Sequence, residues 1–142
     1  MALKLIYSAM SKKNFYFKAH ITKFILEQDA IPLNPFMLFE YFLIDTVNRN
    51  KIRNANNEMI KRVDEVWIFG EISDGVLNEI KLAEKIKKPI KYFKILNSKE
   101  IKEITKEEAV MEKWKRKGQY AQELGEKEHM VMVPEKSLEE KE

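Results

Sequence analysis

Residues 63–93 constrain the fold more than any other part of this chain. Their first part, residues 66–69, is a short run of β-branched and aromatic side chains, which is typical of a buried strand. A polar loop with two glycines follows, and then apolar residues recur at helical spacing over residues 76–86. A proline ends that helix ahead of a second apolar run at residues 90–93. This order predicts a βαβ unit with parallel strands.

The loop between the first strand and the helix is a candidate binding site, because ligands of open parallel sheets bind at the carboxyl ends of strands. It holds Ser73, Asp74 and Gly75, and Glu79 follows one turn into the helix. Backbone N–H groups near Gly75 would favour an anion, and Ser73 offers a hydroxyl. A structural role fits the same residues, with Ser73 as the helix N-cap and Glu79 as a first-turn acid. The residues alone leave both interpretations open.

A second βαβ unit is predicted over residues 3–34. Residues 2–9 are β-rich, residues 15–28 have one broad apolar face, and residues 30–34 form a short second apolar run. Ser11 is a candidate N-cap for the helix, with Asn14 as the alternative. Two such units predict an α/β protein, a flavodoxin/Rossmann-like three-layer sandwich with a mainly parallel sheet of four to five strands.

The next two segments differ sharply in polarity. Residues 35–47 are nearly continuous apolar with four aromatics, which predicts either a buried helix that covers the sheet or a contact with substrate or another subunit. From this segment we expect a homodimer or higher homo-oligomer. Residues 48–57 are polar and asparagine-rich, which predicts a loop that leads into a helix over residues 55–63.

The pattern weakens after residue 93. We expect a helix from Ser98 through Ile104, and a further helix that begins at Thr105 with a capping box to Glu108. The predicted organisation is therefore an α/β domain over residues 1–97 and a helical extension over residues 98–133, which packs on the domain or a partner subunit. A charged, disordered tail completes it over residues 134–142.

Composition and motifs exclude several kinds of chemistry. The chain has no cysteine, so disulfides, thiolate chemistry and Cys-ligated zinc are impossible. His20 and His129 lack ligand-spaced partners, and neither a Walker A loop nor a G-x-G-x-x-G motif is present, so we expect no metal and no cofactor. The balance of 26 basic and 23 acidic residues does not indicate nucleic-acid binding. No apolar run approaches the roughly 20 residues of a membrane span, so we expect a cytoplasmic protein without membrane contact.

Three segments in this order resemble one known family. They read IYSAMS at residues 6–11, VDEVWIF at residues 63–69 and SDGVLNEI at residues 73–80. Their order and spacing resemble the nucleoside 2-deoxyribosyltransferase-like family, including its 2'-deoxynucleoside 5'-phosphate N-hydrolase branch. The resemblance covers about residues 3–94 and implies the α/β fold described above.

The resemblance implies a glycosyl-transfer mechanism on a nucleoside or nucleotide. Glu79 would attack the anomeric carbon of the sugar while the base departs, and water or another base would resolve the glycosyl-enzyme ester. Tyr7 would position Glu79 or the sugar. In the hydrolase branch Ser11, Ser73 and the amides near Gly75 would hold a 5'-phosphate.

Two further features of the resemblance concern polar side chains around the sugar and the base. In the transferase branch Asp74 would contact a sugar hydroxyl. The family usually carries an aspartate that protonates the leaving base, but this chain has Asn56 in that neighbourhood, and an asparagine cannot be a general acid. Either Glu58 substitutes for it, or the activity is altered or lost. A nucleotide-binding module without the chemistry, or an interaction protein, is therefore the alternative.

Overall fold

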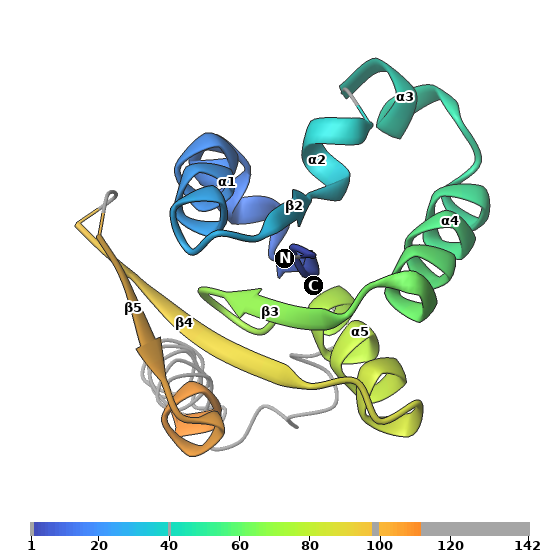
Figure 1. The fold of residues 1–142 in the computed structure, drawn as a ribbon. Coiled ribbons are helices and arrows are strands. Elements are labelled where there is room, and N and C mark those ends of the chain that lie inside the picture. Colours follow the sequence, from blue (N-terminus) through green and yellow to red (C-terminus); the bar gives the residue numbers. More distant parts are fainter. Residues whose placement is uncertain (1, 40, 98–99, 112–142) are drawn as a thin grey trace, which may run out of the picture.

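The protein folds around one twisted sheet, in a computed structural model that describes residues 2–39, 41–97 and 100–111 (Figure 1). The strand order is β2-β1-β3-β4-β5, in which the first four strands are parallel and β5 runs antiparallel to β4. This confirms the predicted α/β sandwich with a mainly parallel sheet, and the order matches the flavodoxin-like arrangement. The strands are β1 Leu5–Met10, β2 Ile31–Leu33, β3 Glu65–Phe69, β4 Ile90–Leu96 and β5 Glu100–Ile104.

Helices cover both faces of the sheet (Figure 1). The 3-10 helix η1 (Lys12–Phe17) and helix α1 (Lys18–Glu27) lie on one face, and α4 (Arg49–Arg62) and α5 (Asp74–Lys85) lie on the other. Side chains along β1 alternate between these faces, as the pleat of a strand requires. The core on the α1 face contains Ile6, Met10, Ile21, Ile25, Trp67, Phe69 and Phe93. The core on the α4 and α5 face contains Tyr7, Ala9, Ile60, Val63, Val66, Ile68, Val76, Ile80, Ala83 and Tyr92.

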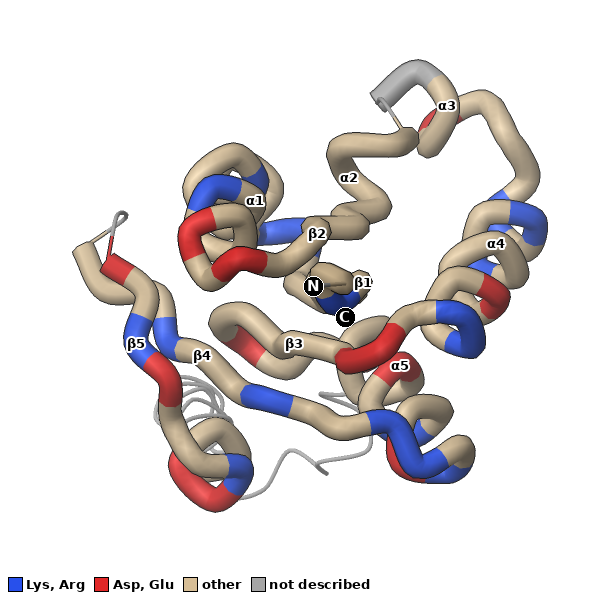
Figure 2. The backbone as a smooth tube through the Cα atoms, viewed as in Figure 1, with Lys and Arg blue, Asp and Glu red and all other residues tan. Residues whose placement is uncertain are grey.

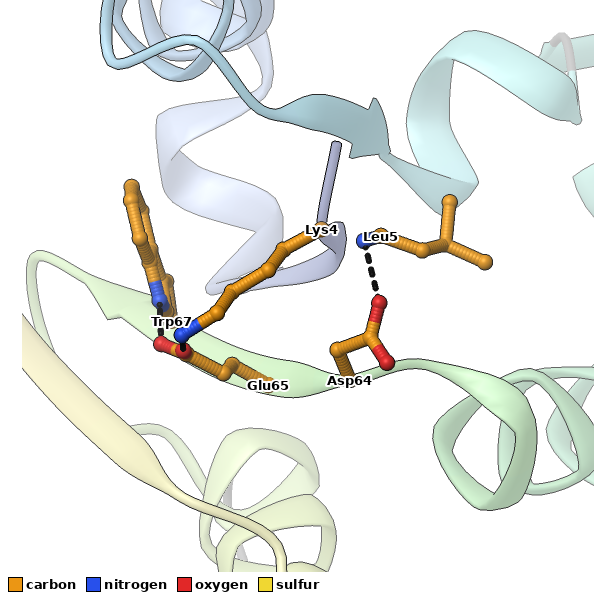
Figure 3. A network of polar contacts seen from close by, with 5 residues as sticks. All are labelled: Lys4, Leu5, Asp64, Glu65 and Trp67. Atoms are coloured by element: carbon orange, nitrogen blue, oxygen red, sulfur yellow. Dashed lines mark hydrogen bonds and ion pairs between the residues drawn. The ribbon is translucent and has the colours of Figure 1, made fainter. Parts of the chain in front are cut away.

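A polar network joins the amino ends of β1 and β3 (Figure 3). Glu65 is buried and accepts hydrogen bonds from Lys4 Nζ at 2.7 Å and from Trp67 Nε1 at 2.9 Å. The backbone N–H of Leu5 donates to Asp64 at 2.7 Å. Burial alone would raise the pKa of Glu65, but the hydrogen bonds from Lys4 and Trp67 outweigh it and the pKa is lowered. The network favours the observed register of β1 on β3.

Residues 35–47 do not form the single buried helix expected from their apolar character. They form two short helices, α2 (Pro35–Leu38) and α3 (Tyr41–Thr46), and the extended backbone of Phe39 ends the first. Met37 and Leu38 are about half exposed, at 50% and 49% of their surface. One turn is too short to bury a whole apolar face, so the prediction of a buried covering helix is wrong.

Helix α4 begins earlier than the sequence predicts. The side chain of Asn48 accepts a hydrogen bond from Asn50 N at 2.8 Å and caps the helix, which continues to Arg62. The predicted loop over residues 48–57 is therefore wrong from Arg49 onward. Most of the outer face of α4 is polar and exposed, so the apolar period that marks a helix is visible only near its end, at Met59 and Ile60.

The predicted helix from Ser98 to Ile104 is wrong, because residues 100–104 form strand β5, which pairs with β4. The capping box that follows is confirmed: Glu108 N donates to Thr105 Oγ1 at 3.1 Å, and Thr105 N donates to the Glu108 carboxylate at 3.3 Å. Residues 112–133 of the predicted extension and the predicted tail at 134–142 lie outside the described residues.

Charged residues of both signs follow one another along β5 and the turn of helix after it (Figure 2). β5 is an edge strand, and its Glu100, Lys102 and Glu103 side chains are exposed. Charges of this kind discourage pairing of the edge with another strand. Within the part of the chain that the structure describes, no helix is long and apolar enough to cross a bilayer.

Candidate functional site

The carboxyl ends of β1 and β3 mark the point where the strand order of the sheet reverses. The chain leaves β1 through η1 and α1 on one face, and it enters β3 from α4 on the other. In open parallel sheets this switch point is where ligands bind. Ser11 follows β1 there, and Gly70 follows β3. The predicted site residues can therefore be located relative to this edge.

Tyr7 and Glu79 are brought into direct contact on the α5 side of the sheet. Tyr7 lies in β1 and is fully buried, and its hydroxyl donates a hydrogen bond to the carboxylate of Glu79. Glu79 lies in the second turn of α5, three residues after Val76 and one before Ile80, both of which pack in the core. Helical spacing therefore turns Glu79 toward the sheet rather than toward solvent. The first-turn, fully solvated role that the sequence left open does not describe this side chain.

Burial changes the acid–base behaviour of both members of the pair. Removal of the carboxylate from water raises the pKa of Glu79 to about 7, although the hydrogen bond from Tyr7 opposes this rise. Burial first, and then the neighbouring Glu79, raise the pKa of Tyr7 well above its ordinary value. Tyr7 therefore stays a hydrogen-bond donor, while Glu79 exchanges its proton near neutral pH.

Ser73, Asp74 and Gly75 lie at the amino end of α5, as the sequence predicts. Ser73 Oγ accepts from Val76 N at 3.3 Å, so this side chain is the N-cap of the helix. Asp74 occupies the first turn. A Cβ on Gly75 would meet no heavy atom within 4 Å, so the backbone here is open to an approaching group.

Ser11 lies at the carboxyl end of β1 and is buried, where it caps η1 by accepting from Lys13 N at 3.3 Å. Asn56 lies in α4, one turn before Ile60, on the face that packs against the sheet. Its Oδ1 atom is buried and has no hydrogen-bond partner in the described part of the chain. No hydrogen bond found there joins Ser11 or Asn56 to the pair of Tyr7 and Glu79.

Glu58 does not take the place of the missing acid. Its carboxylate is exposed and forms ion pairs within α4, with Lys61 at 3.2 Å and with Arg62 at 3.8 Å. Asn56 and Glu58 are two residues apart, so they point to different sides of the helix. The side of α4 that faces the sheet therefore carries the amide of Asn56 and not the carboxylate of Glu58.

Three residues at the same edge of the sheet were not among the site residues predicted from the sequence. They are Asn14, Asn34 and Gly70. Gly70 has a φ of +77°, and a Cβ placed on it would lie 2.6 Å from Asn14 Nδ2. Asn34 is buried, caps α2 and approaches the sulfur of Met10 with Nδ2 at 3.5 Å. The single usable signal was the glycine directly after a predicted strand, since a close backbone approach often requires one.

A hollow of about 420 Å³ lies elsewhere, at the amino end of β4. Its lining includes Tyr92 and an ion pair between Lys106 and Glu84 at 2.6 Å. None of the predicted site residues lines it. Among residues 2–39, 41–97 and 100–111, no three His, Asp or Glu side chains gather closely enough to hold a metal ion.

Comparison with known families adds one result. The sequence model described as "Domain of unknown function (DUF7768)" matches residues 5–93. The chain belongs to this family. The DUF7768 region begins at the first residue of β1 and ends within β4, so it contains both Tyr7 and Glu79 and excludes β5. No curated protein matches the chain. The family thus coincides with the parallel part of the sheet and its helices.

Proposed function

We propose that this protein cleaves or transfers the N-glycosidic bond of a nucleoside or a nucleoside 5'-monophosphate, with Glu79 as the nucleophile. The observation that carries the proposal is the hydrogen bond from the buried Tyr7 hydroxyl to Glu79, which joins β1 of a flavodoxin-like sheet to the helix that follows β3. The resemblance to nucleoside 2-deoxyribosyltransferases supports the same pair. The protein would act on a small molecule in the cytoplasm and would need neither metal nor cofactor.

The chemistry divides into two displacements at one carbon. The ionised Glu79 carboxylate attacks the anomeric carbon, the C–N bond breaks, and the base leaves with the bonding electrons and takes up a proton. Water, or a second base, then attacks the same carbon and releases Glu79 as a carboxylate. Water in this step yields the free sugar and one proton, whereas a second base yields a new nucleoside. A carboxylate suits both steps because the transition state is oxocarbenium-like.

The environment of Glu79 fits a nucleophile. With a pKa of about 7, a large share of Glu79 is ionised at neutral pH, but the charge is poorly hydrated because the side chain is partly buried beside Tyr7. Such a carboxylate gains more from a developing positive charge than one in bulk water. Tyr7 fixes one carboxylate oxygen, which leaves the other to face the sugar.

Asn56 determines how the base departs. Its amide can hydrogen-bond to the base but cannot supply a proton in the manner of a carboxylic acid. The proton that the departing base takes up therefore comes from solvent, and bases that are easily protonated in water are the better substrates. The second candidate function follows from the same residue: a nucleotide-binding module that holds its ligand without cleaving it.

A panel of nucleosides and nucleoside 5'-monophosphates tests the proposal. Chromatography of the products measures free base with the wild type, with Glu79→Gln and with Glu84→Gln, the last being an exposed acid on the same helix. Base release that persists in Glu84→Gln and falls at least a hundredfold in Glu79→Gln supports the enzyme. Binding without release supports the module. Equal release by wild type and Glu79→Gln would exclude Glu79 as the nucleophile.

The exposed apolar residues of the α2–α3 segment are proposed to contact a second copy of the chain. They are Met37, Leu38, Leu43 and Val47, with between 36% and 50% of their surface accessible. Leu38→Glu should convert the predicted homo-oligomer to a smaller species in light scattering. A wild-type protein that is monomeric throughout the micromolar range would contradict this part of the proposal.

A further inference from the structure

The side chain of Asn14 lies against the backbone where β3 ends. Asn14 belongs to η1, and its Nδ2 atom occupies the space that a side chain on Gly70 would need, 2.6 Å from the ideal Cβ position. Gly70 has a positive φ of 77°, a conformation that favours glycine, and a side chain there would displace the Asn14 amide. The amide of Asn14 therefore sits directly at the carboxyl end of β3, beside β1.

Two contacts hold the backbone around Asn14. Asn14 N donates to Ser11 O at 2.9 Å, which closes the first turn of η1 behind the buried Ser11. Lys13 forms an ion pair with Glu71 at 3.8 Å, which joins η1 to the loop that follows Gly70. These two contacts hold the backbone of η1 close to the loop after Gly70, with the side chain of Asn14 between them and the end of β3.

The amide nitrogen of Asn14 has no hydrogen-bond partner in the described residues, although the atom is buried. A buried donor that makes no hydrogen bond lowers stability, so such groups are rare in folded proteins and indicate a role beyond packing. The position is the switch point at which sheets of this order bind ligands. An N–H donor of this kind pairs with an oxygen acceptor.

We propose that Asn14 is a ligand-binding residue, whose side-chain amide donates a hydrogen bond to an oxygen acceptor of the molecule bound at the carboxyl ends of β1 and β3. The inference rests on the proposed function for the class of ligand, which is a nucleoside or its 5'-monophosphate. The acceptor is an oxygen of the nucleoside itself or of the phosphate. Gly70 is the residue that leaves room for the amide.

Calorimetric binding to the full chain with the Glu79→Gln change tests this role, since that change stops turnover. The probes are a nucleoside and its 5'-monophosphate, with and without Asn14→Ala or Asn14→Asp. We expect Asn14→Ala to weaken binding about tenfold through loss of the donor, and Asn14→Asp to weaken it further because its carboxylate also sets a negative charge against the oxygen acceptor. Loss confined to the monophosphate assigns the acceptor to the phosphate, and equal loss assigns it to the nucleoside.

A measurement without ligand keeps the test independent of the reaction. The thermal midpoint of the ligand-free Asn14→Ala protein should stay within about 2 °C of the parent, because no internal hydrogen bond is lost. A large fall in the midpoint, unchanged affinity, or a parent that binds neither probe overturns the proposal. Failure of base release alone would count against the proposed reaction and leave the binding role of Asn14 standing.

Discussion

The hydroxyl of Tyr7 in β1 and the carboxylate of Glu79 in α5 form a hydrogen bond between residues 72 positions apart in the chain. Tyr7 is fully buried, and Glu79 is turned toward it by the spacing of Val76 and Ile80 on α5. The pair therefore joins the sheet to the helix that follows the switch point. It also holds an ionisable group whose pKa is about 7, and a perturbed pKa of this kind is common at functional sites.

The pH dependence of activity should report Glu79. A nucleophile must be ionised, so kcat/KM should rise with pH through a value near 7 and then level off. The hydrogen bond from Tyr7 holds the pKa of Glu79 below the value that burial alone would give. Tyr7→Phe should therefore shift the rising limb to higher pH, with activity partly restored at pH 9. An unshifted limb would mean that Tyr7 does not position or tune Glu79.

Stability should depend on pH in the opposite sense. Because the folded-state pKa of Glu79 lies above its ordinary value of 4.5, the folded state holds this proton more tightly than the unfolded chain does. The contribution of Glu79 to stability is thus fully present below about pH 4.5 and is lost as pH rises through about 7, a change of at most roughly 3 kcal/mol. Glu79→Gln should stabilise the protein by about 2 kcal/mol at pH 8 and change little at pH 5. Urea unfolding at both pH values measures this, and a loss at both would show that Glu79 is structural.

The network around Glu65 should show the usual acid behaviour. The pKa of Glu65 is lowered, so its contribution is present at neutral pH and disappears as pH falls below the ordinary range of a carboxyl. Glu65→Gln should reduce the free energy of unfolding by about 1–2 kcal/mol at pH 7, through the weakened bonds to Lys4 and Trp67. The difference between the two proteins should shrink below pH 4. A difference independent of pH would assign the effect to packing.

Gly70 and Gly75 offer a matched pair of substitutions. Gly70→Ala introduces a side chain at a φ of +77° and against Asn14, and it should cost about 1–3 kcal/mol. Gly75→Ala places a methyl group in open space in the first turn of α5 and should be neutral or stabilising by up to about 1 kcal/mol. Thermal unfolding compares them directly. Equal effects would contradict the positive φ of Gly70 together with the close approach of Asn14.

Local sequence patterns predicted the parallel sheet because its strands are buried on both faces. The run at residues 66–69 is apolar throughout, as expected for a central strand, and Ser73 caps the helix after it, which is one of the two roles that the sequence allowed. β5 was missed because Glu100, Lys102 and Glu103 favour a helix locally, while pairing with β4 decides the outcome. The start of α4 was missed because its polar surface hides the helical period.

The site was only partly predictable for a related reason. Tyr7 and Glu79 lie within segments whose fold is evident, so their approach follows once the two elements pack. The contact of Asn14 with Gly70 depends on the course of η1, a 3-10 helix that periodicity does not reveal. The orientation of Glu58 away from the sheet likewise could not be predicted, because it depends on which side of α4 faces the sheet.

Intact-protein mass spectrometry after rapid acid quench detects the glycosyl ester that Glu79 would form. A nucleoside or 5'-monophosphate that releases base is mixed with excess protein, and the quenched sample is digested to locate any adduct. We expect a mass increase equal to the transferred glycosyl group on the peptide that contains Glu79, and no increase in Glu79→Gln. Base release without an adduct, or an adduct on another residue, would contradict the assignment of Glu79 as the nucleophile.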